Sequence, residues 1–150
     1  MRIALYQPDI PQNTGNIFRL GACLGVSIDI IEPTGFIFDD KRFKRSAMDY
    51  LDHIDYKRHI DWQHFYDWKK ENNFRLILMT TKSQESLYKF KFNPSDILLF
   101  GRESAGVPKN IHNIVDHRLK IPMKSGVRSI NLSSSVALVL GEGLRQTNQL

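Results

Sequence analysis

The chain of 150 residues has one cysteine and no long apolar segment, and each shortage excludes a class of protein. The single cysteine, Cys23, excludes a disulfide framework and a metal site built from several thiolates. No apolar run approaches the roughly 20 residues of a membrane-spanning helix. The stretch from Met1 turns polar at Gln7, too early for a secretory signal. We therefore expect a cytoplasmic protein that does not bind membranes.

Several enzyme motifs are missing as well. The five histidines show no HExxH pattern and no paired spacing with acids, so we expect them at the surface and expect no metal site. The segment Gly101–Pro108 has two glycines five residues apart, as in a phosphate-binding loop. Gly106 is followed by Val107 rather than by Lys and Ser or Thr, so the match fails. A tight strand-to-helix turn explains this segment equally well.

Composition and charge are compatible with one globular domain over residues 1–150. The hydrophobic share of 41% and the charged share of 25% exclude a disordered or collagen-like chain. The formal net charge is +5. A generic basic surface and a polyanionic partner both explain this charge. The cluster Lys41-Arg42-Phe43-Lys44-Arg45 favours the second explanation, because clustered basic side chains neutralise phosphates.

Apolar strands alternate with helical segments along the chain. Residues 75–80 and 96–100 are nearly continuous apolar runs, which is typical of buried parallel strands. Further strands are expected at 2–6, 26–31 and 119–121, and a short one within 52–60. Helices are expected from an Asn13 cap to Gly25 and over 39–51, 61–72, 83–87, 108–115 and 132–146. The alternation predicts an α/β domain with a mostly parallel sheet flanked by helices.

The aromatic side chains of the helix over 61–72 have two interpretations. Trp62, Phe65, Tyr66 and Trp68 could form a platform on which bases stack. Aromatic residues at helical spacing more often belong to the core, and we expect that here.

The C-terminal segment is the best candidate for chemistry. Asn131 is suited to cap the last helix, whose apolar face is formed by Leu132, Val136, Val139, Leu140 and Leu144. A polar loop precedes it, which a purely structural helix would not need. Ligands of open α/β sheets bind outside the carboxyl ends of the strands, so the loops after Met79, Phe100 and Ile121 are expected to form a site.

Three motifs, in order, resemble those of the SPOUT superfamily of RNA methyltransferases. They are Asn13-Thr14-Gly15-Asn16-Ile17-Phe18-Arg19-Leu20, Leu99 through Pro108, and Ile121-Pro122-Met123 with Arg128 through Ser133. The chain is most similar to the small single-domain members that 2′-O-methylate the wobble nucleotide of certain leucine tRNAs. Flanking matches at 6–11, 31–33 and 39–42 extend the resemblance over essentially the whole chain.

The resemblance implies a fold and a cofactor. In this family the last helix is tucked through a loop of the preceding chain and forms a deep trefoil knot. The methyl donor S-adenosylmethionine lies bent in that knot, and no metal is needed. Carried over by position, the donor-binding residues are Met79, Gly101, Ile121 and Ser129.

The resemblance also implies a substrate and a catalytic pair. In relatives the arginine matching Arg19 acts as the general base or as the group that activates the hydroxyl, and we expect Arg19 to orient the ribose and the adjacent phosphate. Asn131 is expected to serve as helix cap and as a polar contact near the donor. No extension beyond the domain is expected, so the tRNA anticodon stem-loop would bind across a homodimer. Its phosphates would contact Lys41, Arg42, Lys44 and Arg45. The alternatives are 2′-O-methylation at another tRNA or ribosomal RNA site, and a catalytically silent RNA-binding protein of the same fold.

Overall fold

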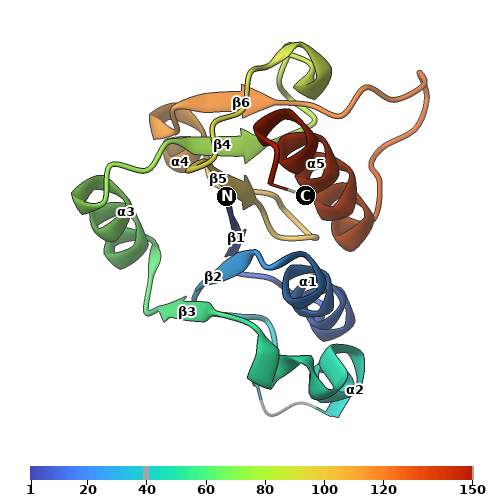
Figure 1. The fold of residues 1–150 in the computed structure, drawn as a ribbon. Coiled ribbons are helices and arrows are strands. Elements are labelled where there is room, and N and C mark those ends of the chain that lie inside the picture. The colour runs from blue at the N-terminus through green and yellow to red at the C-terminus, as the bar shows by residue number, and fades with distance from the viewer. Residues whose placement is uncertain (39–40, 150) are drawn as a thin grey trace.

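A six-stranded sheet lies at the centre of the part of the chain that the computed structural model describes, residues 1–38 and 41–149 (Figure 1). The strands are β1 (Arg2–Tyr6), β2 (Ser27–Ile31), β3 (Tyr56–His59), β4 (Leu76–Met79), β5 (Ile97–Phe100) and β6 (His117–Leu119). Their order is β3-β2-β1-β5-β4-β6, and every neighbouring pair is parallel. The predicted parallel α/β sheet is therefore confirmed.

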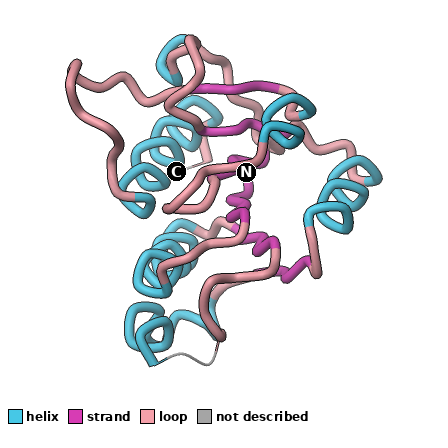
Figure 2. The backbone as a smooth tube through the Cα atoms, turned by 180° about the vertical axis from the view of Figure 1, so that it is seen from behind, coloured by secondary structure: helices cyan, strands magenta, loops and turns pink. Residues whose placement is uncertain are grey.

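Helices cover both faces of the sheet (Figures 1 and 2). They are α1 (Pro11–Leu24), α2 (Lys41–Ala47), α3 (Trp62–Glu71), α4 (Lys109–Ile114) and α5 (Leu132–Thr147), with 3-10 turns η1 (Met48–His53) and η2 (Leu87–Lys89). Successive side chains of a strand point to opposite faces. Ile3 and Leu5 of β1 therefore join the core beneath α1 and α5, while Ala4 and Tyr6 join the core beneath α3 and α4.

The first helix begins earlier than the sequence indicated. α1 starts at Pro11 with Ile10 as its N-cap, and Asn13 is not the cap. Proline suits the first helical position because its φ is fixed and its missing N–H would have had no partner there. The side chain of Asn13 is therefore available for contacts outside the helix. The start of the charged helix predicted over 39–51 lies outside the described residues, since these exclude Asp39 and Asp40.

The sixth strand is shifted toward the N-terminus relative to the predicted 119–121. Leu119 pairs with Met79, the last residue of β4, so β6 ends where its partner strand ends. Beyond it, Lys120 bonds to the main chain of Glu85 and Leu87 instead of a strand. The bounds of a strand of three residues are set by the strand that it pairs with, and the local sequence does not show which strand that is.

Three of the four aromatic residues predicted for the core of α3 belong to it, while Tyr66 is half-buried and its ring stacks on Trp62. Phe65 is fully buried, and Trp62 and Trp68 pack against the same cluster. The expectation that all histidines lie at the surface is wrong for His59, which is fully buried. Its Nε2 lies 2.8 Å from Oδ1 of Asp29, a buried carboxylate that needs polar partners. In the described part, no helix is long and apolar enough to cross a membrane.

Candidate active-site cleft

A cleft of about 440 Å³ opens where β4, β5 and β6 end and α5 begins. The loops that follow the three strands line it, together with the first turn of α5. Met79, Gly101, Ile121 and Ser129, the four residues assigned to the donor by resemblance, all line this one cleft. Asn131 lines it as well. The structure thus brings together five of the six residues that the sequence singled out for donor binding and catalysis.

The loop after β5 is a tight turn that closes on itself. The N–H of Arg102 donates to the carbonyl of Gly106 at 3.0 Å, and the N–H of Gly106 donates back at 2.8 Å. Gly106 has a φ of +66°, which favours glycine. A Cβ on Gly101 would lie 2.5 Å from the carbonyl carbon of Gly106. Glycine at both positions therefore lets two backbone segments meet at the edge of the cleft.

A chain of hydrogen bonds joins this loop to the starts of α1 and α5. Oε2 of Glu103 accepts from the N–H of Asp9 at 2.8 Å, and Oε1 accepts from Nδ2 of Asn13 at 3.1 Å. Oδ1 of Asn13 accepts from Nδ2 of Asn131 at 3.0 Å. Oδ1 of Asn131 accepts from the N–H of Ser134 at 3.3 Å, which confirms the predicted N-cap. The polar end of Asn131 is thereby held from two sides.

A second contact, between Asp9 and the same loop, reinforces this arrangement. Nη2 of Arg102 donates to Oδ1 of Asp9 at 2.6 Å, and Oγ and N of Ser104 donate to Oδ2 at 2.5 and 3.2 Å. The hydrogen-bonded guanidinium of Arg102 holds the pKa of the Asp9 carboxyl below its usual value. Sequence reasoning did not assign roles to Glu103 or Asp9. The network that reveals them joins residues about 90 positions apart.

His112 on α4 supplies an unusual polar atom to the cleft wall. The residue lines the cleft, and its Nε2 is buried with no hydrogen-bond partner among the described residues. Burial lowers the pKa of the imidazole, and the neighbouring cations Arg118 and Lys82 lower it further. In the described residues, no group of three or more His, Cys, Asp or Glu side chains is arranged to hold a metal ion.

Arg19 does not line the cleft. It lies on the exposed side of α1, and its guanidinium sits 5.5 Å from the ring centroid of Tyr50 in η1. Asn13 on the same helix faces the cleft. Six residues correspond to about 600° of helix rotation, so these two side chains point roughly 120° apart. Arg19 is therefore the one of the six sequence-assigned site residues that the structure places outside the cleft.

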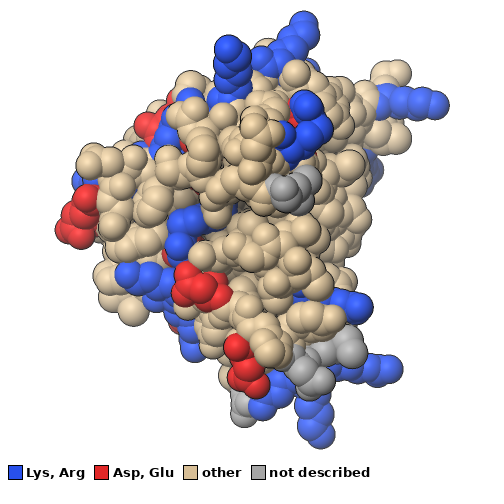
Figure 3. Space-filling view, in the orientation of Figure 1, with Lys and Arg blue, Asp and Glu red and all other residues tan. Residues whose placement is uncertain are grey.

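The basic cluster lies away from the cleft, on α2. Lys41, Arg42, Lys44 and Arg45 are all exposed, while Phe43 and Ala47 turn inward against α1. In Figure 3, blue side chains project from the α2 end of the molecule. The cluster is therefore a surface feature, as predicted.

The chain is similar to proteins of one family. A sequence model of the SpoU rRNA methylase family matches residues 1–141. The tRNA (cytidine(34)-2'-O)-methyltransferase of Beijerinckia indica is 50% identical over 99% of this chain and 92% of its own length. The protein of the same name from Escherichia coli K12 is 40% identical, over 97% of this chain and 93% of its own.

Solved structures of methyltransferases are also similar to this chain. One described as "Structural insights into the 2-OH methylation of C/U34 on tRNA" superposes with a TM-score of 0.92 at 37% identity, covering 97% of this chain and 94% of the other. AviRb of Streptomyces viridochromogenes, solved with AdoMet, has a TM-score of 0.89 at 22% identity, covering 97% of this chain and 57% of that one; it shows the shared fold. The fold and cleft thus define a SpoU-type methyltransferase scaffold. The chain belongs to the SpoU rRNA methylase family.

Proposed function

We propose that this chain transfers a methyl group from S-adenosylmethionine to the 2′-hydroxyl of a tRNA wobble nucleotide, in the cytoplasm. The substrate is position 34, a cytidine or modified uridine, of leucine tRNAs. The observation that carries the proposal is the single cleft lined by Met79, Gly101, Ile121, Ser129 and Asn131. It occurs in a chain whose relatives at 50% and 40% identity are named tRNA (cytidine(34)-2'-O)-methyltransferases.

The residues of the cleft fit the methyl donor. The cleft volume of about 440 Å³ lies within the usual range for small-molecule sites. Leu78, Val107 and Ile121 supply apolar wall for a flat ring. Nε2 of His112, which has no hydrogen-bond partner among the described residues, is a polar atom that a ligand would satisfy. Met79, Gly101, Ile121 and Ser129 would hold the donor. When bound, S-adenosylmethionine supplies an electrophilic methyl group on a positively charged sulfur.

The chain's own residues orient the acceptor. Asn131 is held by Asn13 and by the start of α5, so its amide is presented in a fixed position at the cleft. Both oxygens of Glu103 accept hydrogen bonds from Asp9 and Asn13, which assigns this carboxylate to holding the site together. The contribution of Arg19 is electrostatic: its guanidinium binds the phosphate and stabilises charge that develops on the hydroxyl oxygen.

A homodimer reconciles that role with the position of Arg19. We propose that Arg19 of one copy serves the cleft of the other, because it faces away from its own cleft. Leu138 on α5 is 45% exposed and offers apolar surface for the second copy. The tRNA anticodon stem-loop would bind across the two copies, with its phosphates on Lys41, Arg42, Lys44 and Arg45.

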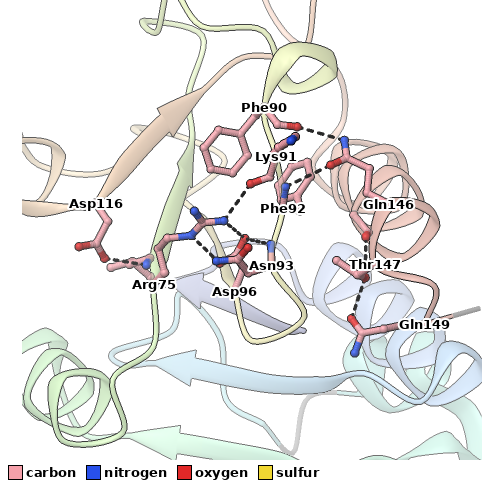
Figure 4. Close-up of polar contacts among 12 residues, drawn as sticks. Arg75, Phe90, Lys91, Phe92, Asn93, Asp96, Asp116, Gln146, Thr147 and Gln149 are labelled. Atoms are coloured by element: carbon pink, nitrogen blue, oxygen red, sulfur yellow. Dashed lines mark hydrogen bonds and ion pairs between the residues drawn. The ribbon is translucent and has the colours of Figure 1, made fainter.

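The trefoil knot implied by the resemblance is part of the same proposal. α5 packs against α1 and β5, and its C-terminal end is fastened to the segment that precedes β5. There, Nε2 of Gln146 donates to the carbonyl of Phe90 and its Oε1 accepts from the N–H of Phe92, both at 3.1 Å (Figure 4). Once the last helix had been threaded, these two hydrogen bonds would help to keep it in place.

The proposal is tested with purified protein, methyl-labelled S-adenosylmethionine and bulk tRNA from a strain lacking the enzyme. We expect label in 2′-O-methylcytidine or a 2′-O-methyluridine derivative at position 34 of leucine tRNAs. Arg19→Ala should lose about 100-fold or more in transfer while still binding the donor, because it removes electrostatic stabilisation and leaves the cleft intact.

Other outcomes would contradict parts of the proposal. Label elsewhere in tRNA, or only in ribosomal RNA offered in parallel, would discard the wobble assignment and keep the chemistry. If the protein bound neither the donor nor RNA, both the methyl transfer and the RNA substrate would be discarded, and only the fold assignment would stand. Full transfer by Arg19→Ala would remove that residue from the mechanism.

A further inference from the structure

The segment 122–130, here called the cleft loop, is weakly tied to the rest of the molecule. It joins β6 to α5 and contains a single turn at Ser125–Gly126. Among the described residues, no hydrogen bond between two backbone groups connects residues 122–130 to the rest of the chain, and the carbonyl of Ile130 accepts from Oγ of Ser135 at 3.5 Å. Figures 1 and 2 show it projecting from the body of the molecule before it returns to α5. A segment whose backbone groups bond mainly to water moves at low cost in free energy.

The cleft loop has two different sides. Met123, Ser129 and Ile130 line the cleft, and Ser129 is one of the four donor-assigned residues. Lys124 and Arg128 lie between them in sequence and are exposed to solvent. The same nine residues therefore form one wall of the small-molecule site and one patch of outer surface.

The outer side of the loop is cationic. Among the described residues, no ion pair involves Lys124 or Arg128. The cleft itself is lined by two cations, Lys82 from the loop after β4 and Arg102, whose guanidinium is paired with Asp9. Glu103 is the one acidic residue among the described residues that line it, and its oxygens are already engaged. Such an arrangement suits phosphate groups, which Arg and Lys bind directly.

We propose that Lys124 and Arg128 bind RNA phosphates and that the cleft loop thereby couples RNA binding to donor binding. This inference rests on the proposed function, since it takes the cleft as the donor site and RNA as the substrate. RNA held on the outer side orders the loop, and the ordered loop presents Met123, Ser129 and Ile130 to the donor. Each ligand therefore tightens the binding of the other by the same factor.

The α2 cluster provides a natural contrast. It also carries exposed cations, but it lies at the other end of the molecule in Figure 1, with α5 and α1 between it and the cleft loop. Phosphate contacts there add affinity without touching any cleft residue. Removing two charges from either place should weaken RNA binding similarly, whereas only the cleft loop should affect the coupling.

The experiment compares the wild type, Lys124→Gln/Arg128→Gln and Lys41→Gln/Arg45→Gln. The affinity for a leucine-tRNA transcript is measured between 50 and 200 mM salt, with and without saturating S-adenosylhomocysteine, the unreactive product. In both double variants, the slope of log affinity against log salt should become shallower by about 1.4–1.8, because two phosphate contacts are lost. The product should tighten RNA binding about tenfold in the wild type and in the α2 variant, but less than about threefold in the cleft-loop variant.

Each result decides something. An unchanged salt slope in Lys124→Gln/Arg128→Gln would overturn the phosphate contacts, and undiminished coupling in that variant would overturn the role of the loop. Wild-type protein that methylates tRNA but shows no coupling would overturn this inference while the proposed function stands. Wild-type protein that binds neither product nor RNA would overturn both. Equal melting temperatures of the three proteins, measured in parallel, exclude misfolding as the cause of a loss.

Discussion

At the scale of single residues, the cleft depends on polar atoms whose partners come from distant parts of the chain. Asn13, Glu103 and Asn131 form one hydrogen-bonded row across three segments. Each of these side chains forms a hydrogen bond with a segment other than its own and holds that segment in place. Their value lies in position, because a polar group held from two sides presents its remaining surface to a ligand with little loss of conformational entropy on binding.

His112 gives a pH-dependent prediction at this scale. Burial, followed by Arg118 and Lys82, lowers its pKa in the folded protein below the ordinary value of 6.5. The unfolded chain therefore takes up a proton near pH 6.5 while the folded chain does not. The free energy of unfolding should fall as the pH drops from about 6.5 toward the lowered pKa, and should not depend on this group above that window.

The measurement is urea unfolding of the wild type and His112→Leu at several values between pH 5 and 8. The variant should lose this part of the pH dependence. His53→Leu, at an exposed position, is the control and should keep it. Identical pH profiles for the wild type and His112→Leu would contradict the assignment.

At the scale of elements, α2 depends on a glycine in α1. A Cβ on Gly15 would lie 2.9 Å from the N of Ala47 and 2.9 Å from the O of Phe43, and would also meet Ser46. These are mostly backbone atoms of α2, which cannot rotate away. Gly15 is thus the position that lets the basic helix pack closely on the helix of the first motif.

Gly15→Ala should therefore destabilise the protein by about 1–3 kcal/mol, as overpacking does, although alanine favours helices more than glycine. RNA binding should weaken too, because α2 and its cations are displaced. Gln12→Ala, on the exposed side of the same helix, should change stability by no more than about 0.5 kcal/mol. Urea unfolding compares the three proteins, and an equally stable Gly15→Ala would show that α2 adjusts without strain.

At the scale of the whole molecule, the position of Arg19 predicts cooperation between two copies. If Arg19 serves the cleft of its partner, two inactive variants can restore one another. Arg19→Ala leaves the donor cleft intact but lacks the arginine. Gly101→Ala retains Arg19 but damages the cleft, because its Cβ would clash with Gly106. Their mixed dimer has one complete site.

The two variants are co-expressed with different tags, and the doubly tagged dimer is isolated. Its methyl transfer should be about half that of the wild type, since one of two sites is complete. Activity no higher than that of either variant alone would mean that Arg19 acts within its own chain. A doubly tagged species that never forms would contradict the homodimer itself.

Some elements of the fold could be predicted from the sequence and others could not, and the difference has a physical reason. Apolar runs and helical periodicity are local, so the strands at β1, β2, β4 and β5, the Asn131 cap and the buried face of α5 followed directly from neighbouring residues. The order of the strands, the shift of β6 to end opposite Met79, and the start of α1 at Pro11 needed the partner element.

The site divides in the same way. The rule that ligands bind at the carboxyl ends of parallel strands pointed to the loops after Met79, Phe100 and Ile121 as neighbours, and the resemblance assigned Met79, Gly101 and Ile121 to the donor. Only the tertiary structure showed that Glu103 links Asn13 to Asp9, that His59 is buried against Asp29, and that Arg19 faces away from its own cleft. Hydrogen bonds between segments 90 residues apart, and the rotation of a helix about its axis, are set by packing of the whole chain, and no local pattern records them.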